Sequence, residues 1–261
     1  MRLWIILSAW LVFVSHGYAG QAAVAMPDRF SAQVAQQVLD KGGNAVDAAV
    51  AASMVLAVTY PEAGNLGGGG FMLVRHQQQD YFLDYRETAP SKAHRDVYLN
   101  EQGEVIPRQS LVGVQAAGVP GTVAGLWEAH QRFGRLPWAE LMKPAITLAE
   151  QGFEVPQDLA DLASWYQGWL GDKATQVNFA NYFGRLEAGK VVKQPELATT
   201  LTRIAKLGAD DFYRGQTAGY LLAQAGSWFS AEDLANYRPR WRAPLMGEWR
   251  GHQIITAPPP S

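Results

Sequence analysis

The sequence predicts an α+β fold in which helices pack on a mostly antiparallel sheet. The expected order is two helices, a hairpin, a mostly helical stretch and a second hairpin near Thr256. A doubly wound parallel sheet requires strands that alternate with helices, so this order excludes it. The 261 residues, 48% of them hydrophobic and 18% charged, are enough for one large globular domain or two small ones.

The segment from Lys41 to Pro90 organises the chain. We expect a helix over Ala45–Val58, where nearly every residue is apolar and Asn44 can cap the first turn. At about 21 Å this helix is too short to cross a membrane, which takes roughly 20 residues, so we expect it to be buried in the core. A second helix is expected just before it, over about Ser31–Lys41, with Ser31 as its cap.

A hairpin follows this core helix. Pro61 and a glycine-rich bend end the helix, and strands are expected over Phe71–His76 and Tyr81–Arg86. Side chains alternate along a strand, so Asp84 and Arg86 share one face. Arg86 therefore stands at a strand end, where functional sites are often placed.

The remaining elements are predicted from apolar spacing, caps and breakers. The helices are expected over Val123–Phe133, Leu136–Gln151 with a kink or split at Pro144, Pro156–Leu170, Pro195–Leu207, Gln216–Ala225 and Ser230–Tyr237, and the second hairpin over Leu245–Trp249 and His252–Thr256. Residues 90–110 are expected to form a surface loop with a short helix or turn, and residues 172–194 to be irregular with a few strand-like residues.

Residues 1–19 have the pattern of a secretory signal peptide. Arg2 supplies the positive charge, Leu3–Val14 is an apolar run, and small residues precede Ala19. We expect cleavage after Ala19 and an exported chain of residues 20–261, periplasmic or extracellular, with no membrane attachment. The alternative, an uncleaved anchor, is disfavoured because the apolar run is short for a span.

Composition and motifs exclude several functions. A net charge of −2 without a basic patch predicts no nucleic-acid partner, and the lack of cysteine excludes disulfides and thiolate chemistry. The glycine run at 67–70 leads into a strand without a Lys-Ser or Lys-Thr pair, so it is not a phosphate loop. The chain has no G-x-S-x-G or H-E-x-x-H motif, and its five histidines are scattered. We expect no metal and no cofactor.

Arg86 is the one candidate binding residue. A guanidinium group holds a carboxylate through two parallel hydrogen bonds and never loses its proton. Beside a glycine bend it can clamp an acidic substrate. The alternative is a structural ion pair with Asp84 or Glu87, which the local pattern alone favours, and Asp84 is also a candidate for orienting Arg86.

Several segments together resemble the γ-glutamyltransferases, the glutathione hydrolases. They are residues 42–75 (GGNAVDAAVAASMVLAVTYPEAGNLGGGGFMLVR), 84–90 (DYRETAP), 118–125, 144–145 with 149–153, 211–215 and 258–261 (PPPS). The resemblance covers essentially the whole chain after the signal peptide.

The resemblance implies an αββα sandwich of the N-terminal-nucleophile hydrolase type, made as a precursor that cuts itself into a large and a small subunit. The new N-terminal threonine of the small subunit is then the nucleophile, with its own α-amine as base. It passes the γ-glutamyl group of glutathione or a related compound to water, an amino acid or a dipeptide. Arg86 is implied to hold the α-carboxylate of that group.

The nucleophile motif of the family has no counterpart here, since none of the threonines matches it (Thr59, Thr88, Thr122, Thr199, Thr200 and Thr256). In the family the Pro-Pro-Pro-Ser segment lies well before the self-cleavage site. We therefore expect no catalytic residue in this chain, an incomplete sandwich that corresponds to the front of the large subunit, and partners in the rest of that subunit and the small subunit. Alone, the chain is then expected to be inactive, because it lacks the nucleophile, and poorly soluble, because its open strand edges and apolar faces favour aggregation.

Two alternatives remain on the sequence. One is another enzyme of the superfamily, such as a β-lactam acylase or a poly-γ-glutamate-cleaving enzyme. The other is a non-catalytic remnant, either a binding module for γ-glutamyl compounds or a pseudoenzyme.

Overall fold

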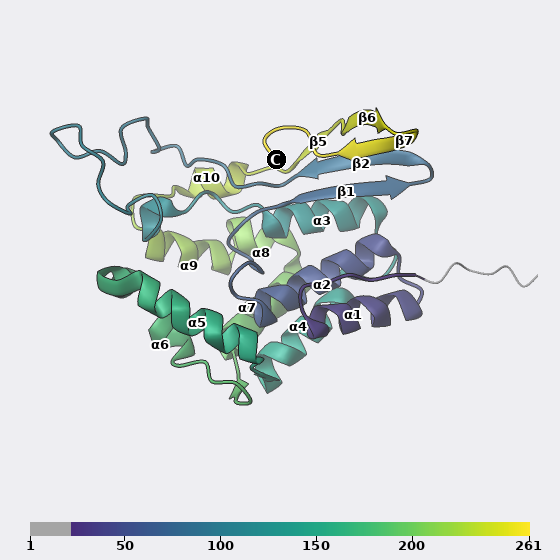
Figure 1. The fold of residues 1–261 in the computed structure, drawn as a ribbon, viewed down its shortest axis with the longest axis horizontal. Coiled ribbons are helices and arrows are strands. Elements are labelled where there is room, and N and C mark those ends of the chain that lie inside the picture. Colours follow the sequence, from purple (N-terminus) through teal and green to yellow (C-terminus); the bar gives the residue numbers. More distant parts are fainter. Residues whose placement is uncertain (1–21) are drawn as a thin grey trace, which may run out of the picture.

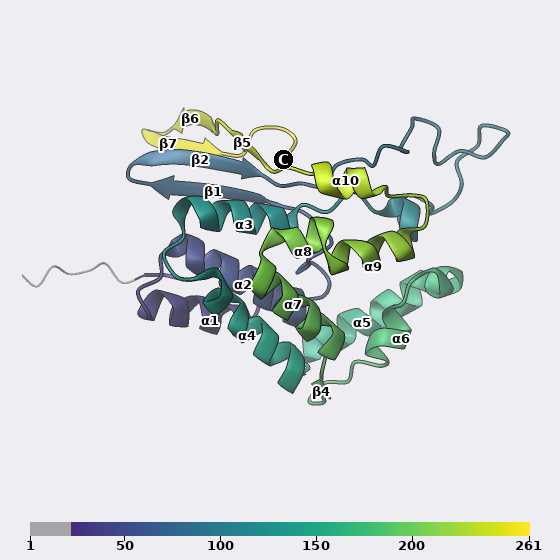
Figure 2. The same ribbon diagram turned by 180° about the vertical axis from the view of Figure 1, so that it is seen from behind.

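The computed structural model describes residues 22–261, and the expected signal peptide lies outside the described residues. Helices occupy the lower part of the molecule in Figure 1, and the strands of the two hairpins lie along its upper edge. The view from behind gives the same layering (Figure 2). The expected α+β class is confirmed.

The helices and strands have the following bounds. The helices are α1 Arg29–Asp40, α2 Ala45–Thr59, α3 Thr122–Phe133, α4 Trp138–Gln151, α5 Gln157–Leu170, α6 Phe179–Phe183, α7 Pro195–Leu207, α8 Ala209–Arg214, α9 Gln216–Ala225 and α10 Ala231–Asn236. The strands are β1 Phe71–His76, β2 Gln79–Asp84, β3 Phe153–Glu154, β4 Val191–Val192, β5 Arg240–Arg242, β6 Leu245–Trp249 and β7 His252–Thr256.

Helix α2 is the buried core helix that the sequence predicts. The Asn44 side chain accepts hydrogen bonds from the amides of Val46 and Asp47, and Asp47 accepts one from the Asn44 amide, which completes a capping box. Asp47 is fully buried and also accepts hydrogen bonds from the amides of Arg135 and Leu136. The helix packs against α1, α3 and α4, so it ties the early and middle parts of the chain together.

The predicted cap of the first helix is wrong by three residues. Asp28, not Ser31, is the N-cap of α1, and its carboxylate accepts a 2.6 Å hydrogen bond from the Ser31 amide. Ser31 lies in the first turn, where its hydroxyl also donates to Asp28. The helix therefore begins one turn earlier because a carboxylate satisfies its free amides.

The first hairpin has a tighter turn than expected. His76 pairs with Gln79, so only Gln77 and Gln78 form the loop, both with positive φ (49° and 63°). A two-residue turn of this kind matches the twist of the flanking strands. The second strand accordingly begins at Gln79 rather than Tyr81 and ends at Asp84, leaving Arg86 just beyond it.

The sheet and the helical region contain elements that the sequence did not predict. Strand β5 adds to β2 and gives a three-stranded sheet in the order β1-β2-β5. Within residues 172–194 the short strand β4 agrees with the few strand-like residues expected there, whereas α6 was not expected, and α8 stands unpredicted between α7 and α9. Of the kink or split expected at Pro144, the split does not occur, because α4 runs through this proline while packing on α2 and α7.

The second hairpin is poorly covered by the rest of the described chain. Strands β6 and β7 pair only with each other, and they lie above β2 in both ribbon views (Figures 1 and 2). Four large apolar side chains on it are 44–60% exposed (Leu245, Met246, Trp249 and Ile254).

No helix within residues 22–261 is long and apolar enough to span a bilayer.

Two glycines allow α3 to approach the end of the first hairpin. A Cβ atom on Gly125 would lie 2.1 Å from Cγ of Tyr85, and one on Gly121 would lie 1.9 Å from the Tyr85 carbonyl oxygen. Such distances are far inside van der Waals contact. The backbone therefore requires glycine at both positions.

We predict opposite effects for two helical glycine-to-alanine variants. Gly125→Ala should lower the free energy of unfolding by about 2–3 kcal/mol because the new methyl group overpacks against Tyr85. Gly219→Ala, on α9 with open space around it, should raise it by about 0.5–1 kcal/mol through helix propensity. Urea denaturation of both variants beside the parent protein checks the pair, and equal effects would contradict the packing argument.

Asp233 connects α10 to the loop that follows the first hairpin. Its carboxylate accepts hydrogen bonds from the amides of Ser230 and Ser91 and from the Ser91 hydroxyl. Slight burial alone would raise the pKa of Asp233, but the hydrogen bonds from Ser230 and then Ser91 outweigh it and lower the pKa. A depressed pKa means that this carboxylate contributes stability above its unfolded pKa and loses it as the pH falls through its folded pKa.

Asp233→Asn should therefore destabilise the protein at pH 7, by less than about 1 kcal/mol for so exposed a group. The difference between variant and parent should vanish on acidification below the folded pKa of Asp233. Urea midpoints measured from pH 7 down to pH 3 test this, and a difference that is constant across the range would rule out the carboxylate charge as its cause.

Candidate functional site

The candidate site is built around Arg86 at the end of the first hairpin. The ladder between β1 and β2 extends past Asp84 through two hydrogen bonds, from the Tyr85 amide to the Gly70 carbonyl (3.0 Å) and back (3.3 Å). The Arg86 amide donates to Oδ1 of Asp84 (3.1 Å), and the Arg86 carbonyl accepts from the Tyr237 hydroxyl (2.9 Å). Its main chain is thus held on both sides.

The guanidinium group of Arg86 is not engaged by an acidic side chain among residues 22–261. Asp84 instead pairs with Arg242, whose Nε lies 2.8 Å from Oδ2 of the carboxylate. The prediction that Arg86 forms an ion pair with Asp84 or Glu87, which the local pattern favoured, is therefore wrong. The prediction fails because strand β5, which was not expected, brings Arg242 alongside β2 and supplies Asp84 with a cation.

The side chain of Arg86 points into the open. The residue is exposed, and its Nη1 donates to the main-chain carbonyl of Pro260 (3.1 Å). Its guanidinium carbon lies 6.0 Å from the centre of the Phe71 ring. Most of its five N–H donors therefore remain for a ligand, in the planar arrangement that suits a carboxylate.

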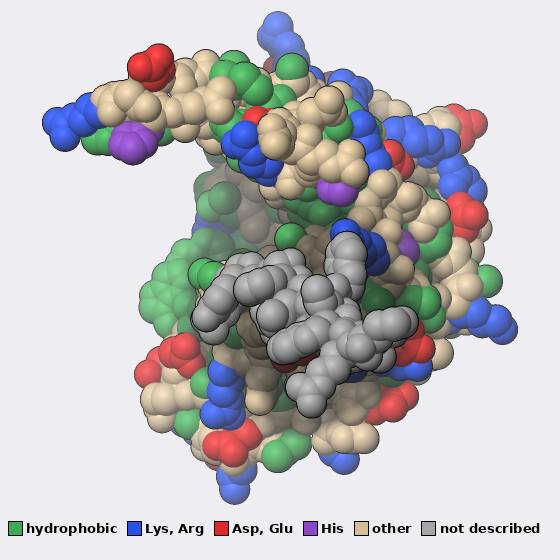
Figure 3. Space-filling view, turned by 90° about the vertical axis from the view of Figure 1, so that its right-hand side faces the viewer, with side chains coloured by type: hydrophobic (Ala, Val, Ile, Leu, Met, Phe, Trp, Pro, Cys, Tyr) green, Lys and Arg blue, Asp and Glu red, His purple; other side chains and the backbone are tan. Residues whose placement is uncertain are grey.

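The sheet face that carries Arg86 is positively charged. Asp84 is directly opposite Arg240, and Phe82 is opposite Arg242, so these side chains share a face with Arg86. This face thus carries three arginines and one aspartate, and an anionic group would be attracted to it. Elsewhere the charges mix: on the face shown in Figure 3, basic and acidic side chains are interspersed.

The glycine bend lies beside this face and is shaped by side-chain contacts. Oδ1 of Asn65 accepts from the Gly68 amide (2.8 Å) and from the Thr122 hydroxyl (2.7 Å). The Gly68 carbonyl accepts from the Gly121 amide (2.7 Å). A Cβ on Gly69 would lie 2.7 Å from the Tyr85 carbonyl oxygen, so the bend is a close-packing device next to Arg86.

Three tyrosines support the hairpin end. Burial raises the pKa of Tyr85 to about 12. Burial, followed by the charges of Asp84 and Glu87, raises the pKa of Tyr237 above its ordinary value, and burial does the same for Tyr213. All three therefore keep their hydroxyl protons at physiological pH and act as neutral donors.

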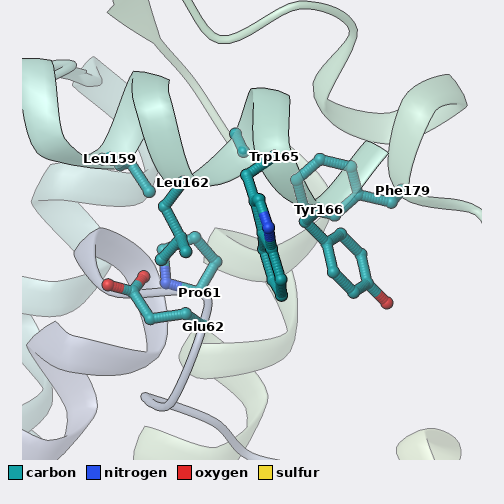
Figure 4. A pocket seen from close by; sticks show the side chains of 8 residues that line it. Pro61, Glu62, Leu159, Leu162, Trp165, Tyr166 and Phe179 are labelled. Atoms are coloured by element: carbon teal, nitrogen blue, oxygen red, sulfur yellow. The ribbon is translucent and has the colours of Figure 1, made fainter. Parts of the chain in front are cut away.

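An apolar hollow away from Arg86 is the alternative place for a ligand. It has a volume of about 330 Å³ and lies between the turn after α2 and helix α5. Figure 4 shows Pro61 and Leu162 on one side of it and Trp165, Tyr166 and Phe179 on the other, while the Glu62 carboxylate points away from the rings. Its lining is apolar and brings no set of polar groups together, so Arg86 remains the better candidate.

The threonines, the acids and the histidines do not assemble a second centre in the described part of the chain. Within residues 22–261 no group of three or more such acids or histidines is arranged to hold a metal ion. Thr59 is buried and hydrogen-bonded to Asp28 and to the Val55 carbonyl, and the Thr122 hydroxyl is bound to Asn65.

Sequence reasoning found Arg86 but missed its supports. Arg242, Tyr237 and Pro260 lie 151 to 174 residues further along the chain from the groups they contact. No local pattern marks them. Only the expectation of a sheet assembled from distant strands could have pointed to them, and β5 was not predicted.

Comparison with known proteins identifies the family of the chain. The Gamma-glutamyltranspeptidase family profile matches residues 31–261. The glutathione hydrolase proenzyme of Pseudomonas aeruginosa is 52% identical over 246 residues, which cover 92% of this chain and 43% of the relative. That of Escherichia coli is 41% identical over 93% of this chain and 43% of its own length. The chain thus spans less than half the length of these relatives.

Solved structures give the same result. Gamma-glutamyltranspeptidase from Pseudomonas nitroreducens, complexed with L-DON, matches with a TM-score of 0.89 at 54% identity, covering 92% of this chain and 72% of that one. The Helicobacter pylori enzyme matches at 0.85 and 39% identity, covering 91% and 70%. The fold class expected from the resemblance, that of the N-terminal-nucleophile hydrolases, is confirmed. The chain belongs to the γ-glutamyltranspeptidase family.

Proposed function

We propose that this chain provides the part of a γ-glutamyltransferase, or glutathione hydrolase, that binds the α-carboxylate of the γ-glutamyl group. The observation that carries the proposal is the exposed guanidinium of Arg86, whose main chain is fixed while its donors face outward. It lies on a face with an excess of positive charge, as a carboxylate-binding site requires. The substrates are glutathione and related γ-glutamyl compounds, and the acceptor is water, an amino acid or a dipeptide.

The nucleophile is proposed to lie in the segment that the relatives have beyond the 43% matched here. An N-terminal threonine there attacks the γ-carbonyl carbon, and its hydroxyl proton passes to its own α-amine. The amide C–N bond breaks and the leaving amine takes up that proton. Water or an acceptor amine then cleaves the resulting ester. No group of the described chain takes part in bond making, and Arg86 contributes binding and orientation.

The exposed second hairpin is the proposed contact with the missing part of the enzyme. Its four apolar side chains and Leu73 on β1, which is 46% exposed, form an uncovered surface around the three-stranded sheet. A sheet buries such a face against another layer. We infer that the rest of the large subunit and the small subunit supply this layer in a precursor that cleaves itself, as the proenzyme names of the relatives suggest.

The exported location remains a proposal as well. It rests on the charge, apolar run and small residues of positions 1–19, which predict cleavage after Ala19, so that residues 20–261 are the exported part of this chain. A periplasmic or extracellular enzyme would act on glutathione that is present outside the cytoplasm.

The alternatives are less well supported. The capsule biosynthesis protein CapD of Bacillus anthracis is 35% identical over 94% of this chain, well below the 52% of the glutathione hydrolase proenzyme of P. aeruginosa. Cephalosporin acylase of Bacillus halodurans matches at 27%. A non-catalytic remnant is distinguished by the two experiments below.

Arg86→Ala, in the enzyme completed by the rest of its length, should raise KM for a γ-glutamyl anilide by about 30-fold or more. Truncating one partner of a charge pair costs on the order of 2–5 kcal/mol. Arg86→Lys should fall in between, since it keeps the charge but loses the bidentate geometry. Arg75→Ala, an exposed arginine of β1, serves as the control and should leave KM unchanged. Unchanged donor kinetics with reduced stability in Arg86→Ala would make Arg86 structural.

The 261-residue chain on its own should show no turnover of a γ-glutamyl anilide, because the proposal places the nucleophile elsewhere. Release of the aniline, followed by absorbance with the purified chain, checks this. Supplying the complementary segment of the enzyme in the same assay should restore activity. Turnover by the purified chain alone would disprove the placement of the nucleophile, and a lack of rescue would favour the remnant.

A further inference from the structure

We propose that Tyr237 is a positioning residue for Arg86, and that together with the Asp84–Arg242 pair it sets the selectivity for donors that carry an α-carboxylate. The inference rests on the proposed function of Arg86. It concerns a residue that touches no substrate and acts through the main chain of the arginine.

The contacts at Arg86 are arranged as a two-sided clamp. The Tyr237 hydroxyl donates to the Arg86 carbonyl (2.9 Å), and the Asp84 carboxylate accepts from the Arg86 amide (3.1 Å). Asp84 is in turn fixed by Nε of Arg242 (2.8 Å). The amide of Arg86 is thus bound by a carboxylate two residues back, and its carbonyl by a hydroxyl from a distant segment, at the point where the regular ladder of β2 stops.

The side chain of Tyr237 is itself fixed by burial and stacking, so its hydroxyl is well placed to fix the main chain of Arg86. It follows α10, is 6% exposed, and its ring stacks on Tyr213 with centroids 5.6 Å apart and an angle of 11°. The Tyr213 hydroxyl donates to the Pro120 carbonyl (2.8 Å). A Cβ on Gly121 would lie 2.2 Å from the Tyr237 hydroxyl oxygen, so the glycine leaves room for that hydroxyl to reach Arg86.

The guanidinium of Arg86, by contrast, is held weakly. Within residues 22–261 the group makes one hydrogen bond, to the main-chain carbonyl of Pro260, and the side chain is exposed. An exposed arginine has many rotamers, so its position at a ligand depends on how well its main chain is fixed. The Tyr237 hydroxyl, a neutral donor because burial raises its pKa, supplies that fixation throughout the physiological range.

The test uses the completed enzyme and two anilide donors. One is γ-glutamyl-4-nitroanilide, and the other is 4-aminobutyryl-4-nitroanilide, which is the same molecule without the α-carboxylate. The variant is Tyr237→Phe, which removes the one hydroxyl and keeps the stacked ring. The control is Tyr98→Phe, because the half-buried Tyr98 also donates its hydroxyl to a main-chain carbonyl, that of Gln115 (3.0 Å), away from Arg86.

Tyr237→Phe should raise KM for the γ-glutamyl donor about 3- to 10-fold, with kcat within about twofold. KM for the decarboxylated donor should not change. In an Arg86→Ala background the same substitution should have no further effect on either KM, since residues that act through one another are not additive. Tyr98→Phe should change neither KM.

An equal rise in KM for both donors would overturn the inference, because a merely structural role does not distinguish them. An additive effect in the Arg86→Ala background would overturn it too. If the parent enzyme itself does not prefer the donor with the α-carboxylate, the proposed function of Arg86 fails and this inference fails with it. Should Tyr237→Phe not fold, Asp84→Asn, which keeps the acceptor for the Arg86 amide but loses the charge that holds Arg242, is subject to the same donor comparison.

Discussion

The structure depends on the close approach of helix α3 to the end of the first hairpin. Gly121 and Gly125 let the helix backbone lie against Tyr85, where any side chain would overlap it. This contact fixes the last residues of the hairpin on one face, while α2 packs beside α3 and ties it to α1 and α4. Protein interiors are too dense to accommodate an added methyl group at such a point. The position of Arg86, the residue after Tyr85, therefore depends on glycine at both 121 and 125.

Local chemistry explains how much of this fold the sequence predicts. The bounds of α7, α9, β6 and β7 agree with expectation because proline, glycine and apolar spacing mark each end within a few residues. Strand β5 was missed because its three residues, Arg240 to Arg242, are too few to show a strand pattern and form a strand only by pairing with β2. The cap at Asp28 was missed because a serine in the first turn offered the same local signal.

The candidate site divides in the same way. Arg86 is visible in the sequence as a cation at a strand end, and its assignment to a carboxylate came from the family resemblance rather than from the local pattern. Its supports, Tyr237 and Arg242, follow α9 in the chain and reach Arg86 and Asp84 only through tertiary structure. The sequence around Tyr237 has no feature that marks it, because a tyrosine after a short helix is common. Its role becomes visible only when the structure shows which group its hydroxyl contacts.

The partner of Asp84 determines what Arg86 is able to do. A carboxylate two residues away on the same face would neutralise the guanidinium if the two were paired, and an incoming substrate carboxylate would then have to displace it. In the structure Arg242 occupies that carboxylate at 2.8 Å, and Asp84 gives Arg86 only a hydrogen bond to its amide. The anion therefore orders the main chain of Arg86 and leaves its charge free. The local pattern predicted that Asp84 neutralises the charge of Arg86. In the structure Asp84 instead orients the main chain of Arg86 and leaves the guanidinium group available to an anionic ligand.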